Sequence, residues 1–168
     1  MAIGRSIGLA LAPAGREARR NGAIRVIIQL VACIFCDILS GVASAEFVAR
    51  RDAASAFLPL PSDRLASLHT LVVPNGHVDD VMGGTDSDLT ATMSLCREIA
   101  KAMVQVVGAD GVNLLNASGP QAGQSVFYLH IHVVPRWRGD GLTTWPVGRS
   151  RRELSEGVLD TLTAFLSS

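Results

Sequence analysis

An alternating stretch around residue 130 constrains the fold more than any other part of this chain. Residues 123–136 read GQSVFYLHIHVVPR, in which Tyr128, His130 and His132 are two residues apart and apolar residues separate them. Because side chains two apart share one face of a β-strand, this spacing predicts a strand over 126–134 with both histidines on the same face. Two neighbouring imidazoles on a rigid strand can bind an anion, ligate a metal or attack an electrophile. The stretch therefore predicts a functional site as well as a strand.

The same stretch resembles the signature of the histidine triad (HIT) superfamily, His-φ-His-φ-His-φ-φ with φ an apolar residue. Tyr128 stands where the family has its first histidine, and the other positions fit. Three upstream motifs are also similar to the family. The first is the pair of cysteines in Cys33-Ile34-Phe35-Cys36, and the second is His69-Thr70-Leu71-Val72-Val73-Pro74 with His77 just after it. The third is Asp110-Gly111-Val112-Asn113, followed by the loop from Asn116 to Gly119. The resemblance covers residues 33–146.

The remaining pattern predicts one α+β domain. Apolar and β-branched runs predict further short strands at 47–50, 54–58, 69–73 and 112–116. A helix is expected after the capping residues Thr85–Asp88 and up to Gly108, and a second after the capping box Ser150–Glu153 and up to Phe165. Residues 26–38 are expected to form a strand or a short helix. The resemblance implies the same HIT-like fold, an antiparallel five-stranded sheet with two main helices packed on it, and commonly a homodimer.

Length and charge bound the number of domains and the partners. The chain has 168 residues, enough for one core, with 15 basic and 15 acidic side chains and no net charge. A protein that binds a nucleic-acid polymer or a membrane surface over a broad area usually has a basic excess, so neither partner is expected. No apolar run in the sequence is long enough to span a bilayer.

Residues 1–30 are expected to form a poorly ordered extension to a HIT-like domain over 31–168. Residues 1–25 carry five arginines and one acidic residue, 26–39 are largely apolar, and Ala43-Ser44-Ala45 is similar to a signal-peptidase site. Cleavage there would remove the Cys-x-x-Cys motif. Three cysteines, an odd number, also do not fit a secreted disulfide framework. We therefore expect a cytoplasmic protein.

The chain has four histidines, and all four lie at positions where the family has histidines. The resemblance implies a nucleotide hydrolase or transferase that cleaves a nucleoside phosphoramidate or a dinucleoside polyphosphate at the α-phosphate. In that chemistry His130 is the nucleophile that forms a nucleotidyl-histidine, His132 donates to the phosphate or protonates the leaving group, and His69 stabilises the phosphate. The substrate-binding residues that the family implies are Asn116, Gly123, Gln124 and Ser125, the last two as donors to phosphate oxygens. This chemistry requires no cofactor.

The first departure from the family pattern concerns zinc. In zinc-containing members the first triad histidine joins a Cys-x-x-Cys pair and another histidine, but here Tyr128 stands in its place and the remaining ligands are Cys33, Cys36 and His77. Structural zinc usually has four cysteine or histidine ligands. The alternatives are a bound zinc ion and a relict site in which Tyr128 packs against its neighbours.

The second departure concerns ribose recognition. The family often has Phe-Leu-Asp before its central strand, whereas this chain has Phe57-Leu58-Pro59, and Asp63 is the nearest acidic residue downstream. Leu68 also stands where the family usually has glycine. The preference for base and sugar therefore stays open.

Three other functions stay open on the sequence. Phosphorolysis of a dinucleoside polyphosphate would use the same histidines with phosphate as the acceptor. A nucleotide-binding protein with little turnover would result if the change at Tyr128 had removed catalysis. A small metal or redox module built on Cys33 and Cys36 would leave His130 and His132 without a role.

Overall fold

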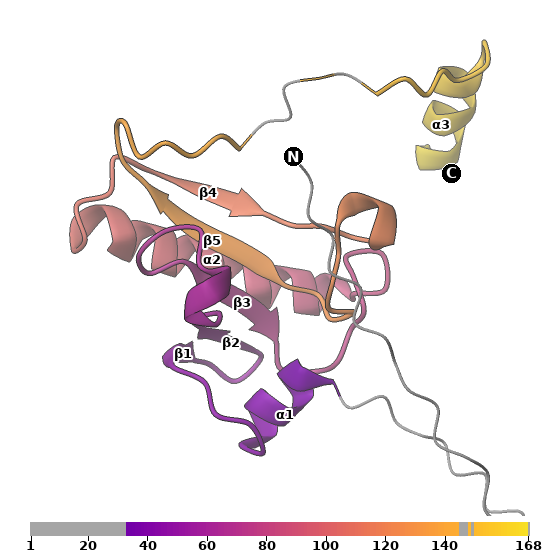
Figure 1. Ribbon diagram of the computed structural model, residues 1–168. Coiled ribbons are helices and arrows are strands. Elements are labelled where there is room, and N and C mark those ends of the chain that lie inside the picture. The colour runs from indigo at the N-terminus through magenta and orange to yellow at the C-terminus, as the bar shows by residue number, and fades with distance from the viewer. Residues whose placement is uncertain (1–32, 145–147, 149, 168) are drawn as a thin grey trace, which may run out of the picture. The chain divides into compact units, whose positions relative to one another are not determined.

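The computed structural model describes residues 33–144, 148 and 150–167. The extension expected over 1–30 lies outside the described residues. The described part contains three α-helices, five strands and two 3-10 turns (Figure 1). In chain order they are α1 (Ile34–Ser40), β1 (Phe47–Arg50), β2 (Ala54–Phe57), η1 (Pro61–Asp63), β3 (Thr70–Pro74), α2 (Asp86–Gln105), β4 (Gly111–Leu115), η2 (Pro120–Ala122), β5 (Ile131–Arg136) and α3 (Val158–Leu166).

The five strands form one antiparallel sheet in the order β1-β2-β3-β5-β4. Strand β5 pairs with β3 on one side, where Leu71 lies opposite His132, and with β4 on the other, where Leu115 lies opposite His132. His132 is therefore held in the interior of the sheet between two neighbouring strands. This architecture confirms the expected α+β fold with a five-stranded antiparallel sheet.

Different helices cover the two faces of the sheet. Side chains alternate along a strand, so Val72 packs against Leu95 of α2, which runs along one face (Figure 1). Leu71 points to the other face, where it packs in a cluster with Phe35 of α1. His132 lies opposite Leu71 and so belongs to the face that α1 covers.

Helix α2 begins and ends close to where the sequence predicts. The Thr85 hydroxyl accepts the backbone N–H of Asp88 at 3.2 Å, and the Asp88 carboxylate accepts the backbone N–H of Thr85 at 3.1 Å, which completes a capping box. Gly108 follows the last turn with a φ of 72°. The expected helix between these residues is confirmed.

The strand predicted over 126–134 is shorter than expected, and the prediction is wrong at its start. Strand β5 begins at Ile131, because the backbone before it has other partners. The N–H of Leu129 donates to the carbonyl oxygen of Val78 at 2.6 Å, outside the sheet. The two histidines of the stretch nevertheless lie side by side, with ring centroids 5.0 Å apart.

The C-terminal helix also begins later than its predicted capping box. Helix α3 begins at Val158, after Gly157 in the left-handed conformation with a φ of 82°. The Ser150 hydroxyl accepts the N–H of Arg152 at 3.1 Å, whereas a capping box would use the N–H of Glu153. No helix in the described part of the chain is long and apolar enough to cross a membrane.

Candidate active site

A cavity of about 550 Å³ lies on the face of the sheet that α1 covers. Its wall is mostly apolar and includes Phe35 and Ile38 from α1 and Phe57 and Leu71 from the strands. The polar residues that reach this wall are Ser44, Glu46, Asp63, Arg64, His69, Ser125, His130 and His132. An apolar cavity with a few convergent polar groups is the usual form of a small-ligand site. The three histidines predicted to be catalytic therefore meet at one cavity.

His130 is buried at this wall with its tautomer fixed. Its Nδ1 lies 2.6 Å from the carbonyl oxygen of Tyr128. Because a carbonyl oxygen can only accept, Nδ1 carries the ring proton, and the neutral imidazole keeps its lone pair on Nε2. The Phe35 ring lies edge-on at 5.4 Å between centroids, and the side-chain amide of Asn116 donates to the His130 carbonyl oxygen at 2.9 Å. Ring and backbone are thus both held in place.

His69 and His132 form a hydrogen-bonded pair beside His130. The N–H of Leu65 donates to Nδ1 of His69 at 3.1 Å, so that nitrogen has the lone pair and Nε2 has the proton. Nε2 of His69 lies 2.9 Å from Nδ1 of His132 and donates to it, which places the His132 proton on Nε2. The site thus combines a lone pair on His130 with an N–H on His132.

Burial keeps this pair neutral at neutral pH. It lowers the pKa of His132 to about 4, and the neighbouring His130 and His69 contribute less to that lowering. Burial also lowers the pKa of His69, while the backbone carbonyl of Asp63 opposes the shift and the Arg64 guanidinium adds to it. His132 is therefore an uncharged N–H donor in the free protein.

Gln124, predicted to donate to phosphate, has its polar atoms engaged with the backbone. Its amide nitrogen donates to the carbonyl oxygens of Asp79, at 2.6 Å, and Val126, at 3.1 Å. Its amide oxygen accepts the N–H of Gly119 at 2.7 Å. The side chain is buried and ties the loop before β5 to the segment after β3.

The other residues predicted to bind substrate lie in the same connection between β4 and β5. Ser125 is exposed at the cavity wall, where its hydroxyl is available. Asn116 lies behind His130 and supports its carbonyl oxygen, away from the cavity wall. Gly123 has a φ of 91°, a conformation that favours glycine, so it shapes the turn that leads to Ser125.

Two charged residues of the cavity wall were not predicted from the sequence. Arg64 lies 3.4 Å from the Glu46 carboxylate and donates from Nε to the carbonyl oxygen of Pro59 at 3.0 Å. The pair joins a turn-rich loop to the segment before β1, and no short-range spacing in the sequence indicates such a contact. Asp63, predicted only as the nearest acid, also lies at the wall.

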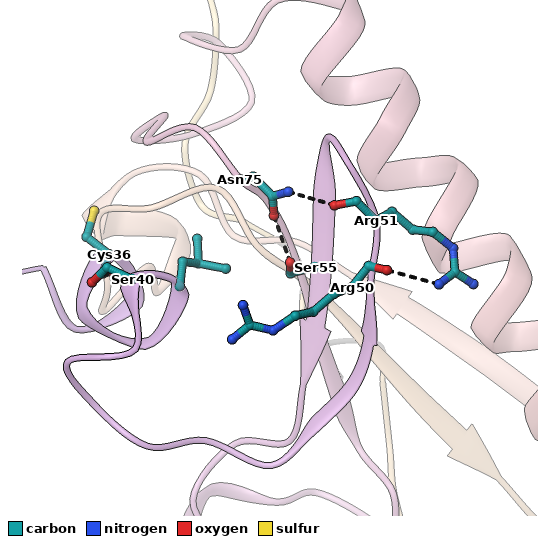
Figure 2. Close-up of a pocket in the computed structure, with 7 residues that line it drawn as sticks. Cys36, Ser40, Arg50, Arg51, Ser55 and Asn75 are labelled. Carbon is teal, nitrogen blue, oxygen red and sulfur yellow. Dashed lines mark hydrogen bonds between the residues drawn. The ribbon is translucent and has the colours of Figure 1, made fainter.

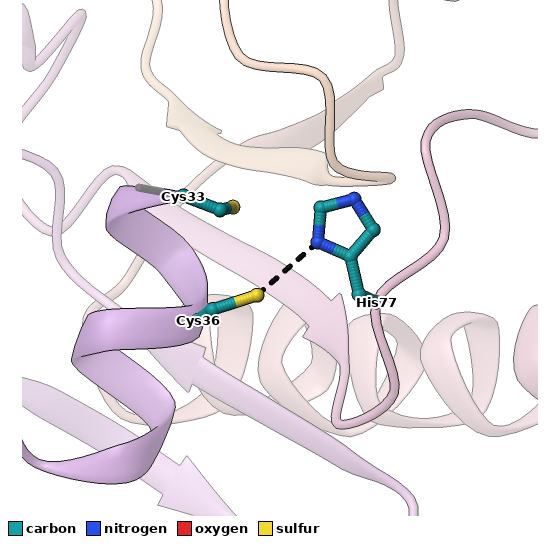
Figure 3. A group of neighbouring side chains, drawn as sticks. All are labelled: Cys33, Cys36 and His77. Atoms are coloured by element: carbon teal, nitrogen blue, oxygen red, sulfur yellow. Dashed lines mark hydrogen bonds between the residues drawn. The ribbon is translucent and has the colours of Figure 1, made fainter. Parts of the chain in front are cut away.

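The cysteine motif and His77 come together as a group that could hold a metal ion (Figure 3). The ligand atoms of Cys33, Cys36 and His77 all lie within 4.8 Å of one another. Nδ1 of His77 is 3.1 Å from Sγ of Cys36, and its Nε2 is 2.9 Å from the Asp79 carboxylate. Sulfur and imidazole nitrogen are ligands that zinc prefers, and a carboxylate commonly supports a ligating histidine. The donor set therefore fits zinc.

Tyr128 is buried beside this group. Its ring meets that of His77 with centroids 4.7 Å apart, and its hydroxyl donates to the carbonyl oxygen of Pro74 at 2.8 Å. Burial raises the pKa of the phenol far above its ordinary value, and the nearby cysteines add to the shift. Tyr128 is thus a neutral residue whose hydroxyl has a partner in β3.

A second cavity, of about 440 Å³, is lined by residues of α1, β1 and β2 (Figure 2). Polar groups in its wall bond to one another. Asn75 accepts from the Ser55 hydroxyl at 2.7 Å and donates to the carbonyl oxygen of Arg51 at 2.8 Å. The Arg51 guanidinium also pairs with Glu98 at 3.0 Å. Because these groups already have partners, the cavity with the histidines is the better candidate site.

Comparison with known proteins decides the family. The family model described as the HIT domain matches residues 40–139, more than half of the chain. This chain belongs to the HIT domain family. The part that matches the HIT domain contains all four histidines, and the Cys-x-x-Cys motif lies just before it.

Relatives and solved structures of the HIT family agree with this assignment. The chain is 36% identical over 110 residues to Protein hit of Bacillus subtilis, across 65% of this chain and 74% of that protein. It is 32% identical over 110 residues to adenylylsulfatase HINT3 of Arabidopsis thaliana, across 66% of this chain and 55% of that protein. A HIT family protein from Bacillus anthracis superposes with a TM-score of 0.68 and 28% identity, across 82% of this chain and 96% of that one. A zinc-bound histidine triad family protein from Mycobacterium smegmatis superposes with a TM-score of 0.61 and 31% identity, across 81% and 96%.

Proposed function

We propose that this HIT domain protein is a nucleotide hydrolase or transferase that acts at the α-phosphate of a nucleoside phosphoramidate or a dinucleoside polyphosphate. The observation that carries the proposal is the tautomer of His130, whose Nδ1 donates to the Tyr128 carbonyl oxygen and leaves the Nε2 lone pair for attack. Membership of the HIT family supports a nucleotide substrate, and the Arabidopsis relative named as an adenylylsulfatase adds adenylyl sulfate to the compounds worth testing.

The reaction has two steps. The Nε2 lone pair of His130 attacks the α-phosphorus, and the bond from phosphorus to the leaving group breaks with its electron pair on the leaving atom. A polyphosphate leaves as an anion, whereas an amine also takes a proton, which His132 supplies once the negative charge of the bound substrate has brought a second proton onto its imidazole. Water then attacks the same phosphorus, and the electron pair of the phosphorus–nitrogen bond returns to His130. The water proton goes to solvent or replaces the one that His132 gave, and a nucleoside monophosphate is released.

His69 is assigned a positioning role through His132 instead of a direct phosphate contact. Both of its ring nitrogens already have partners, the N–H of Leu65 and Nδ1 of His132. This chain of bonds keeps the His132 proton on Nε2, where it can stabilise charge that develops on a phosphate oxygen. The Ser125 hydroxyl is the second donor, and Gln124 holds the loop that presents it.

The apolar part of the cavity is the proposed place of the nucleoside. Phe35 and Phe57 supply aromatic surface for a base, and the carboxylates of Glu46 and Asp63 supply acceptors for ribose hydroxyls. Tyr128 takes the position of the first triad histidine, and its backbone carbonyl orients the nucleophile.

Zinc and a second copy of the chain are further proposed partners. Cys33, Cys36 and His77 would hold the ion, which would cross-link α1 to the segment after β3, and no step of the reaction requires it. The zinc-bound relative from Mycobacterium smegmatis supports this assignment. The proposal also includes a homodimer, in which the sheets of two copies join, and a cytoplasmic location. Sedimentation equilibrium of the full chain tests the dimer.

The test is turnover of adenosine phosphoramidate, diadenosine tetraphosphate and adenylyl sulfate by the full-length protein and by His130→Ala. We expect the wild type to release adenosine monophosphate and the variant to lose at least about 1,000-fold in rate, as removal of a covalent nucleophile usually does. Equal release by both would overturn His130 as the nucleophile. Nucleotide binding without release by either protein would favour the binding-protein alternative, and phosphate-dependent release of adenosine diphosphate would favour phosphorolysis.

A further inference from the structure

The group of side chains beside α1 that could hold one ion has three members. Among the described residues these are Cys33, Cys36 and His77, and no further cysteine, histidine or acidic side chain joins them. The two cysteines are partly exposed, and the His77 side chain is 41% exposed. A small molecule can therefore reach the group from solvent.

Asp79 fixes His77 in the tautomer that binds a metal. Its carboxylate oxygen lies 2.9 Å from Nε2 of His77 and can only accept, so Nε2 carries the proton and the lone pair is on Nδ1. Nδ1 is the nitrogen that lies 3.1 Å from Sγ of Cys36. Asp79 thus supports a ligand without belonging to the ligand set.

Tyr128 lies beside these three residues, but its hydroxyl already has a hydrogen-bond partner in β3. The ring meets that of His77 with centroids 4.7 Å apart, and the hydroxyl donates to the carbonyl oxygen of Pro74 at 2.8 Å. The side chain is fully buried, with Phe35 edge-on at 5.8 Å between ring centroids. To bind an ion, the phenol oxygen would have to leave this hydrogen bond and the packed site around it, which costs free energy.

We propose that Cys33, Cys36 and His77 form a three-ligand zinc site whose fourth position receives a small exogenous nitrogen, oxygen or sulfur donor. Tyr128 keeps that position free, because its hydroxyl belongs to β3. This inference rests on the zinc binding proposed above. A site with three protein ligands exchanges its fourth ligand, whereas a closed four-ligand site does not.

Cobalt(II) is the probe that tests the fourth position, since its visible spectrum reports the ligands directly. The reduced, metal-free full chain is titrated with cobalt(II), and imidazole is then added. For the wild type we expect sulfur-to-cobalt absorption and a shift of the visible bands when imidazole binds. Tyr128→Phe, the matched control, should respond as the wild type does, whereas Tyr128→His should supply the fourth ligand and lose the response to imidazole.

Other outcomes overturn the inference in ways that can be told apart. A wild-type spectrum that imidazole does not change means that the protein closes the site, and loss of the wild-type spectrum in Tyr128→Phe means that the phenol is itself a ligand. Because Tyr128→His alters a buried residue, these two measurements decide the matter even if that variant does not fold. Absence of any sulfur-to-cobalt absorption overturns the zinc site as well, and leaves the hydrolase proposal to be judged by turnover of His130→Ala.

Discussion

At the scale of single residues, Leu68 holds the most strained backbone conformation near the site. It is the one non-glycine residue with a positive φ in the described part of the chain, at 62°, and it directly precedes His69. The left-handed region costs a leucine roughly 1–2 kcal/mol. Glycine avoids this steric cost, but it loses more conformational entropy on folding, which costs roughly 0.5–1 kcal/mol. We therefore expect Leu68→Gly to raise the free energy of unfolding by about 0.5–1 kcal/mol, measured by urea denaturation. Leu60→Gly is the matched control, because Leu60 has a φ of −52° and should lose stability. A loss of stability in Leu68→Gly would contradict the strain.

His132 should make stability depend on pH in a defined window. Its pKa is lowered from 6.5 to about 4 in the folded protein, so between these values the unfolded chain binds a proton that the folded one does not. The contribution of His132 to the free energy of unfolding is therefore fully present above pH 6.5, and it is lost as the pH is lowered towards 4. At roughly 1.4 kcal/mol per pKa unit, the loss is at most about 3.5 kcal/mol. Urea denaturation at pH 7.5 and 4.5 measures it, and His132→Asn should lose less over the same interval. Equal losses in the two proteins would show that the ring is not shielded as described.

At the scale of elements, the loop before β5 depends on the buried amide of Gln124. Gln124→Glu removes the donor to the carbonyl oxygens of Asp79 and Val126 and places a carboxylate against them. We expect this change to cost about 2–3 kcal/mol of stability and to lower turnover, because Ser125 loses its support. Gln121→Glu, in the same connection but exposed, should change neither. A variant with normal stability and a raised KM would instead make Gln124 a direct phosphate ligand.

How far the sequence predicts each element depends on where the backbone finds its partners. Alternation and β-branched residues predicted β1, β2, β3 and β4 well, and Thr85 and Asp88 predicted the start of α2, because those signals are local. The start of β5 at Ile131 was not predictable, since it depends on the bond from Leu129 to Val78, about fifty residues away along the chain. The site shows the same limit. The four histidines are visible in the sequence, but their tautomers depend on Leu65, Tyr128 and Asp79, which only the folded chain brings to them.

At the scale of the whole molecule, α1 links the proposed zinc site to the cavity. Cys33 and Cys36 lie at the start of this helix, and Phe35 between them packs on the sheet and lies edge-on against His130. Helix α1 is not joined to the sheet by the backbone hydrogen bonds that pair the strands. It is held instead by apolar packing and by the cysteine–histidine group. An ion bound there would join α1 to the segment that follows β3. Zinc should therefore affect both folding and nucleotide binding.

Removal of zinc is expected to lower both stability and nucleotide affinity. An ion present at about 100 times its Kd adds about 2.7 kcal/mol to the free energy of unfolding, and a chelator should remove that amount. The affinity for adenosine monophosphate should fall as well, because α1 carries one wall of the cavity. Thermal denaturation and calorimetric titration with the nucleotide measure the two effects, and Cys36→Ser should be insensitive to the chelator in both. A chelator that lowered stability but left nucleotide affinity unchanged would show that α1 keeps its place in the cavity wall without the ion, and that packing of Phe35 against the sheet is sufficient.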